Sequence, residues 1–166
     1  MAATNRELGL IESSWGELTR LVDRIGPEGL SLRGGDGWQI KDHLAHVAAW
    51  EHSLIALFEG RDRLAAMGLM DLPADTDRIN EALWTLHGKE SPEQALRYFH
   101  DSHARLVSAL GTLSDADLQL PYSHYQPGDP DESRPASNWV AGNTYEHYDQ
   151  HVGWMNQLIK ESSAAR

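Results

Sequence analysis

Apolar residues recur every three or four positions in four long segments, and this spacing restricts the fold of the chain more than any other feature. The segments span residues 5–25, 39–59, 92–111 and 143–161, and each is long enough for about five turns of α-helix. No segment alternates apolar and polar residues as a β-strand does. We therefore expect an all-α fold, a four-helix bundle, with residues 1–166 forming a single domain.

Helix-start and helix-stop signals between the second and third segments indicate how the long helices are connected. Gly60 follows the second segment, and Ser91-Pro92 is a typical start for the third. Between them, a shorter amphipathic helix is expected after Asp75 or Asp77. The extra helix predicts a crossover between the second and third long helices instead of a simple hairpin.

Residues 119–137 differ from the rest because they hold four of the seven prolines. We expect neither helix nor strand at that density of proline. The aromatic side chains of Tyr122, His124 and Tyr125 indicate that part of this loop packs onto the bundle. Tyr122 and Tyr125 would line the mouth of a pocket, or they would simply anchor the loop.

The net charge of the chain restricts which partners we expect. Acidic residues outnumber basic ones by 25 to 14, which gives a net charge of −11. Such a surface repels phosphate backbones and anionic lipids, so we expect no nucleic acid and no membrane as a partner. There is no cysteine, no signal-peptide pattern and no apolar run of roughly 18 residues, so a cytoplasmic protein is expected.

Two histidines four residues apart, His147 and His151, are the sharpest sign of chemistry. On a helix they share a face with Trp154 and can bind one divalent ion. The alternative is a pair of core histidines hydrogen-bonded to tyrosine, glutamate or water. A third ligand would come from the second segment, where His43 and His46 are both suitable and helical periodicity does not decide between them.

A carboxylate, Glu51, falls among the apolar positions of the second segment. A buried carboxylate has to be paired, hydrogen-bonded or functional. It would orient a metal-bound histidine or act as a general base, and the alternative is a salt bridge to Arg20 or Arg97. His103, at an apolar position of the third segment, is a further candidate ligand or a core histidine.

Two stretches of the sequence resemble the DinB/YfiT-like superfamily. The second-helix signature of that superfamily is similar to the run Gly37-Trp38-Gln39-Ile40-Lys41-Asp42-His43-Leu44-Ala45-His46, which continues to Ala49-Trp50-Glu51. Its fourth-helix segment is similar to the run Gly142-Asn143-Thr144-Tyr145-Glu146-His147-Tyr148-Asp149-Gln150-His151. By this resemblance the three metal ligands are His46, His147 and His151.

The resemblance covers nearly the whole chain and carries further implications. It implies a four-helix bundle with a crossover, often dimeric, that binds a divalent ion such as zinc, nickel or manganese. The Asn143-Thr144 and Pro121-Tyr122 segments look most similar to the ClbS/DfsB branch, which includes self-protection proteins that disarm a reactive small molecule. Other members resemble transferases or isomerases that use bacillithiol, mycothiol or glutathione. The name DinB refers to damage-inducible proteins and does not imply DNA binding.

These observations lead to one expected function and one alternative. We expect a metal-dependent hydrolase or thiol transferase that acts on a small molecule, reactive electrophiles included, with water or a small thiol in the open coordination positions. Glu51 would be the base or a supporting group, and the pocket would be formed by Trp50, Tyr122, Tyr125 and Trp154. The alternative is a protein that sequesters its small-molecule ligand without turnover. The sequence leaves open whether the chain is an enzyme, which metal, substrate or thiol it uses, and whether it forms a homodimer.

Overall fold

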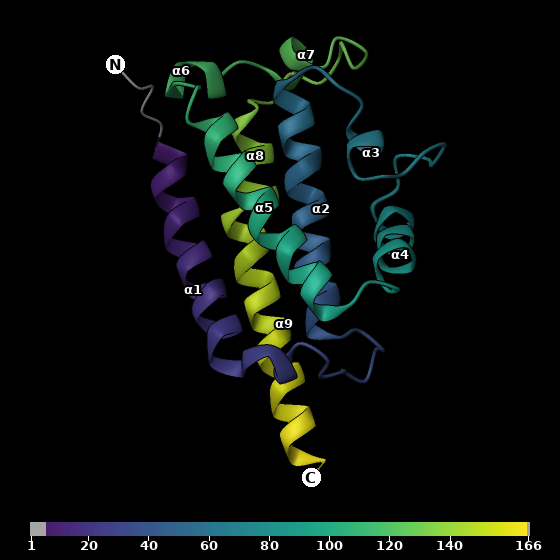
Figure 1. Cartoon of the computed structure of the whole chain (residues 1–166). Coiled ribbons are helices and arrows are strands. Elements are labelled where there is room, and N and C mark those ends of the chain that lie inside the picture. The colour runs from purple at the N-terminus through teal and green to yellow at the C-terminus, as the bar shows by residue number, and fades with distance from the viewer. Residues whose placement is uncertain (1–5, 166) are drawn as a thin grey trace.

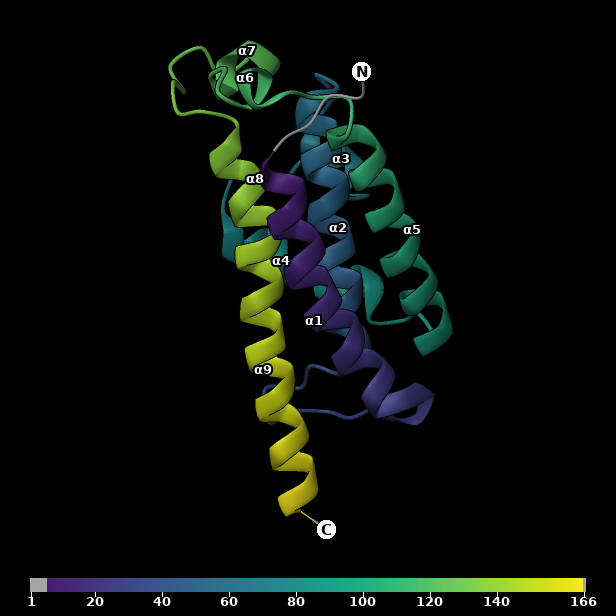
Figure 2. The same cartoon turned by 90° about the vertical axis from the view of Figure 1, so that its left-hand side faces the viewer.

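Four long helical columns lie side by side in the computed structural model, which describes residues 6–165 (Figures 1 and 2). They are α1 (Arg6–Gly29), α2 (Ile40–Phe58), α5 (Pro92–Leu110), and the consecutive pair α8 (Ser137–Asn143) and α9 (Tyr145–Ala164). α1 and α8–α9 run in one direction, and α2 and α5 run in the other (Figure 1). The predicted all-α four-helix bundle is therefore confirmed.

The chain returns from the end of α2 to the start of α5 along the outside of the bundle. This return contains α3 (Arg63–Ala66) and α4 (Thr76–His87), which lie beside α2 (Figure 1). α4 packs on α2 through a small apolar cluster separate from the main core, formed by Ala49, Met67, Leu69, Ile79 and Leu83. The predicted crossover is thus present, and the Asp75 side chain caps α4 by accepting the N–H of Arg78.

The main core consists of the apolar stripes of the four columns. Its fully buried side chains include Ile11 and Leu18 of α1, Leu44 of α2, and Phe99 and Leu106 of α5. Burying one such side chain contributes roughly 1.5–3 kcal/mol. α2 lies against α4, α5, α8 and α9, and every residue from Ile40 to Ala49 is buried. The polar side chains in this part of α2, from Lys41 to His46, are therefore largely enclosed by protein.

The fourth column is longer than expected and contains a break. α8 already begins at Ser137, inside the proline-rich stretch, and Thr144 has φ −128° and ψ −107°, which is not helical. α9 starts at the next residue, so the break sets the direction of its first turn. The predicted start near Asn143 matched only the second of the two helices.

Residues 119–137 were expected to hold no helix, but besides the start of α8 they contain a short helical turn. α6 (Asp115–Leu118) precedes the stretch, and α7 (Tyr122–Tyr125) forms one turn within it. Pro121 precedes the first residue of α7, where a missing N–H costs nothing. The N–H of Tyr122 donates to the carbonyl of Arg134 at 2.9 Å, so the loop folds back on itself at the end of the bundle.

No helix among residues 6–165 is both long enough and apolar enough to cross a membrane.

Candidate metal centre

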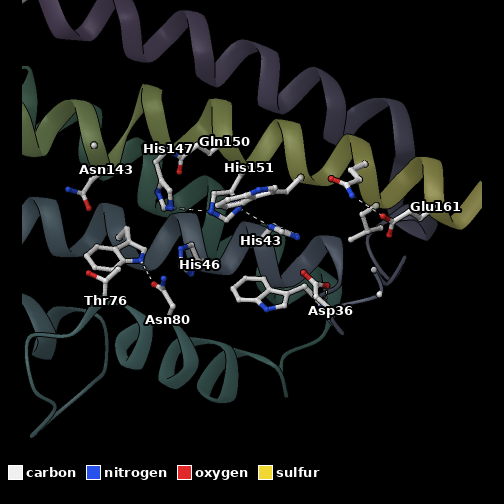
Figure 3. Close-up of a pocket in the computed structure, with 18 residues that line it drawn as sticks. Asp36, His43, His46, Thr76, Asn80, Asn143, His147, Gln150, His151 and Glu161 are labelled. Atoms are coloured by element: carbon white, nitrogen blue, oxygen red, sulfur yellow. Dashed lines mark hydrogen bonds between the residues drawn. The ribbon is translucent and has the colours of Figure 1, made fainter.

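Three imidazole rings meet between α2 and α9. His147 lies in the first turn of α9, His151 follows one turn later, and both face His46 of α2 (Figure 3). The ring centroids are 4.6–5.1 Å apart, and one nitrogen of each ring lies within 4.8 Å of the others. The structure thus brings together the three residues that the resemblance singled out.

The spacing of these nitrogens suits a divalent ion. His147 Nε2 and His151 Nε2 are 3.1 Å apart. Two imidazole nitrogens bound to one tetrahedral zinc ion are roughly 3.3 Å apart, given zinc–nitrogen bonds of about 2.0–2.1 Å. A divalent ion at this position would take the lone pairs of both nitrogens, which face each other.

Burial also keeps these rings in the protonation state that binds metal. Desolvation, reinforced by His147, lowers the pKa of His46 to about 2. Desolvation lowers the pKa of His147 to about 4 and that of His151 well below its usual value. The imidazoles are therefore neutral at neutral pH, and the neutral ring is the metal ligand.

A fourth histidine, His43, lies beside the cluster and contacts His151. Its Nδ1 lies 2.9 Å from Nδ1 of His151 (Figure 3). When His151 donates in this hydrogen bond, its Nε2 keeps a lone pair on the side of His147. Hydrogen bonds of this kind orient metal-binding histidines and fix their tautomer. His43 and His46 thus have separate places, one beside the cluster and one within it.

The cluster forms part of the wall of a cavity of about 710 Å³. The cavity lies between α2, α4, the end of α8, α9 and the turn before α2 (Figure 3). Its tryptophan walls are Trp38, Trp50 and Trp154. Trp50 Nε1–H donates to Asn80 Oδ1 of α4 at 3.2 Å, which fixes one wall. A volume of this size is typical of small-molecule sites.

The turn before α2 places Trp38 against the histidines. The N–H of Gly34 donates to the carbonyl of Trp38 at 2.8 Å, and Gly37 has φ +91°, a conformation that favours glycine. Asp42 then accepts the N–H of Gln39 at 2.9 Å at the start of α2. The Trp38 ring centroid consequently lies 5.1 Å from that of His43 and 5.5 Å from that of His46.

Not all of the predicted site residues reach the cavity. Trp50 and Trp154 line it, but Tyr122 and Tyr125 do not. These tyrosines belong to α7, which lies at one end of the bundle, away from the middle of α2 (Figure 1). There Tyr122 stacks near Trp139, and the Tyr125 hydroxyl donates to the carbonyl of Asp117 at 2.9 Å. The structure assigns both tyrosines to anchoring the loop, which corrects their expected place in the pocket.

Glu51 faces away from the cavity. It is fully buried and does not line the cavity. Its carboxylate accepts the hydroxyls of Ser102 and Tyr148, and His103 Nδ1 lies 3.2 Å from Oε1. Neither salt bridge expected for Glu51, to Arg20 or Arg97, is present among the described residues, and His103 pairs with Glu51 outside the histidine cluster. The network joins α2, α5 and α9, so Glu51 is placed to hold helices and has no route to a ligand.

Three other residues that line the cavity, Trp38, Thr76 and Asn80, were not predicted from the sequence. Trp38 was part of the quoted signature, but nothing in the spacing placed its ring beside His46. Thr76 and Asn80 belong to α4, which the sequence suggested only as a connection. A signal for Asn80 was present in its polar side chain next to Ile79, an apolar position of that helix.

The fold and the cluster together define a class: four-helix bundles with a crossover and three histidines at a cavity. The chain matches the family model described as the DinB superfamily over residues 10–155, and it belongs to that superfamily. The predicted resemblance is confirmed. No curated protein matches the chain in sequence.

Solved structures of other proteins share the fold. A protein from Streptococcus pneumoniae is 14% identical, with a TM-score of 0.72 over 96% of this chain and 94% of the other. The colibactin self-resistance protein ClbS, in complex with double-stranded DNA, is 16% identical, with a TM-score of 0.67 over 93% and 94%. DfsB, described as a sibling lethal factor precursor, is 16% identical, with a TM-score of 0.66 over 93% and 94%. At these identities the likeness shows the fold alone.

The ClbS structure corrects one expectation. Nucleic acid was excluded as a partner because of the net charge of −11. That exclusion is wrong, because a protein with this fold is seen bound to double-stranded DNA. Net charge averages over the whole surface, whereas binding depends on the charge of one patch.

Proposed function

We propose that His46, His147 and His151 hold one divalent ion, such as zinc, nickel or manganese, for a reaction on a small molecule in the adjoining cavity. The observation that supports this proposal is the approach of three neutral imidazole nitrogens to within 4.8 Å of one another on the cavity wall. A divalent ion bound there would act as a Lewis acid and lower the pKa of a water or thiol ligand. The proposed reaction class is hydrolysis or transfer of a low-molecular-weight thiol, on substrates that include electrophiles.

The residues around the ion have distinct proposed roles. His43 holds the His151 ring in one tautomer through the Nδ1–Nδ1 contact of 2.9 Å. Trp50 and Trp154 provide apolar walls for the substrate. Glu51 accepts the hydroxyl of Tyr148, a residue that lies between the two histidines in the sequence of α9, and its proposed role is to hold the helices together. Of the carboxylates, Asp36 and Glu161 line the cavity and are available to accept a proton.

The test is the metal content of protein purified without a histidine tag. We expect about one divalent ion per chain, and far less in His147→Ala, because two histidines of one helix and one of another form the site. His124→Ala is the matched control, since this histidine is exposed on α7 and far from the cavity. Absence of an ion, together with no uptake on reconstitution with zinc, nickel or manganese, would disprove the proposal.

A second candidate function is sequestration of a small molecule without turnover. It is favoured by one observation: Glu51, the expected general base, is enclosed in the core and does not line the cavity. ClbS, a self-resistance protein, has the same fold. A chelator distinguishes the candidates, because it would abolish metal-dependent turnover and leave plain ligand binding intact. Double-stranded DNA belongs among the ligands to be tested, since ClbS binds it.

A further inference from the structure

The acidic side chains of the cavity lie toward one of its ends. Asp36 and Glu161 lie toward one end, Thr76 and Asn80 lie toward the other, and the histidines lie between them (Figure 3). None of the described residues that line the cavity is lysine or arginine. One end of the cavity therefore carries negative charge, and no positive side chain in the lining balances it.

The two carboxylates are available to a ligand. Asp36 Oδ1 accepts the N–H of Trp38 at 3.0 Å, and Glu161 Oε1 accepts Nε2–H of Gln157 at 3.0 Å. Neither residue forms an ion pair with any residue of the described part of the chain.

Aromatic rings flank this acidic end. Trp154 is 51% exposed, a large apolar surface for a cavity wall, and its ring centroid lies 4.9 Å from that of His151. Trp38 and Trp154 both lie against His43, with ring centroids at 5.1 and 6.4 Å. Tryptophan faces attract organic cations, most strongly where water is partly excluded.

We infer that the cavity takes an organic cation whose apolar body lies on Trp38 and Trp154 and whose charge faces Asp36 and Glu161. The inference rests on the proposed function, since it names the ligand class of the same site. The uncharged end of such a ligand extends past the histidines toward Asn80.

The experiment uses two ligands of similar size and opposite charge, benzyltrimethylammonium and phenylmethanesulfonate, neither of which is a strong metal ligand. Binding to the full chain is followed by tryptophan fluorescence, because Trp38, Trp50 and Trp154 line the cavity. We expect the cation to bind about fivefold or more tightly than the anion. In the double variant Asp36→Asn with Glu161→Gln the preference should shrink to about twofold or less, and Asp149→Asn, exposed on α9 outside the cavity, should retain it.

Each result has a defined meaning. The inference is supported if the preference for the cation is lost in the double variant and kept in the wild type and in Asp149→Asn. Equal or tighter binding of the sulfonate, an unchanged preference in the double variant, or no binding of the cation at concentrations on the order of 10 mM would overturn it. Titrations with and without a chelator separate this inference from the metal proposal, because the preference must persist in metal-free protein. If the protein binds no metal but still prefers the cation, only the metal proposal is disproved.

Discussion

At the scale of single residues, the tautomer of His151 would decide whether the proposed metal centre can bind an ion. His43 Nδ1 and His151 Nδ1 are 2.9 Å apart, so one of the two nitrogens must carry the shared proton. Only when His151 carries it does Nε2 of His151 present a lone pair toward His147. An apolar side chain at position 43 could not accept this proton, whereas His43 can and would thereby hold His151 in the tautomer suited to metal.

The variant His43→Ala should weaken binding of a divalent ion. Loss of the hydrogen bond to His151 leaves that ring free to turn and to change tautomer, and such losses cost about 10–100-fold in affinity. Competition with a chelating dye measures the affinity, with His124→Ala as control. Affinity equal to that of the wild type would show that His43 does not position His151.

Periodicity alone did not separate His43 from His46, because both belong to the buried side of α2. The difference depends on where α9 lies, and no local pattern encodes that position. The resemblance resolved it by supplying the three-dimensional context. The same limit applies to Trp38, whose ring reaches the histidines only through the turn at Gly37.

At the scale of helices, the long amphipathic segments and the crossover were predictable from sequence. Stripes of apolar residues, the caps at Asp75 and Ser91, and the stop at Gly60 are local signals, and local energies dominate there. The break at Thr144 was not predicted, because neither proline nor glycine occupies that position and the residue is fully buried. The position of α7 likewise depends on hydrogen bonds from Tyr122 and Ser123 to the carbonyls of Arg134 and Glu132, which are distant in sequence.

The Glu51 network predicts a stability effect that spans three helices. In Glu51→Gln one of the hydroxyls of Ser102 and Tyr148 loses its acceptor, since an amide has a single oxygen. We expect the free energy of unfolding to fall by about 1–3 kcal/mol, with metal content unchanged. Urea denaturation measures the loss, and Glu146→Gln, exposed on α9, is the control. An unchanged stability, or a lower metal content at full stability, would return Glu51 to the candidate site.

At the scale of the whole molecule, the buried histidines link stability to pH. Burial lowers the pKa of His46 to about 2, below its ordinary value of 6.5. Below pH 6.5 the unfolded chain therefore binds a proton that the folded chain does not. The contribution of His46 to stability is fully present above that pH and is lost as the pH falls.

For metal-free protein in a chelator, the free energy of unfolding should drop on acidification. The part due to His46 amounts to about 2 kcal/mol between about pH 8 and about pH 5. Urea titrations of the wild type and His46→Gln across this range isolate that part, because the variant lacks the group. Equal slopes for the two proteins would mean that His46 is protonated in the folded state as readily as in the unfolded chain.

The separate apolar cluster beneath the crossover makes one wall of the cavity independent of the main core. α4 packs its own Ile79 and Leu83 against Met67, Leu69 and, from α2, Ala49, and it supplies Thr76 and Asn80 to the cavity. The main core lies among the four long columns. Substitutions on the cavity side of α4 should therefore change which ligands fit without disturbing the packing between the long helices.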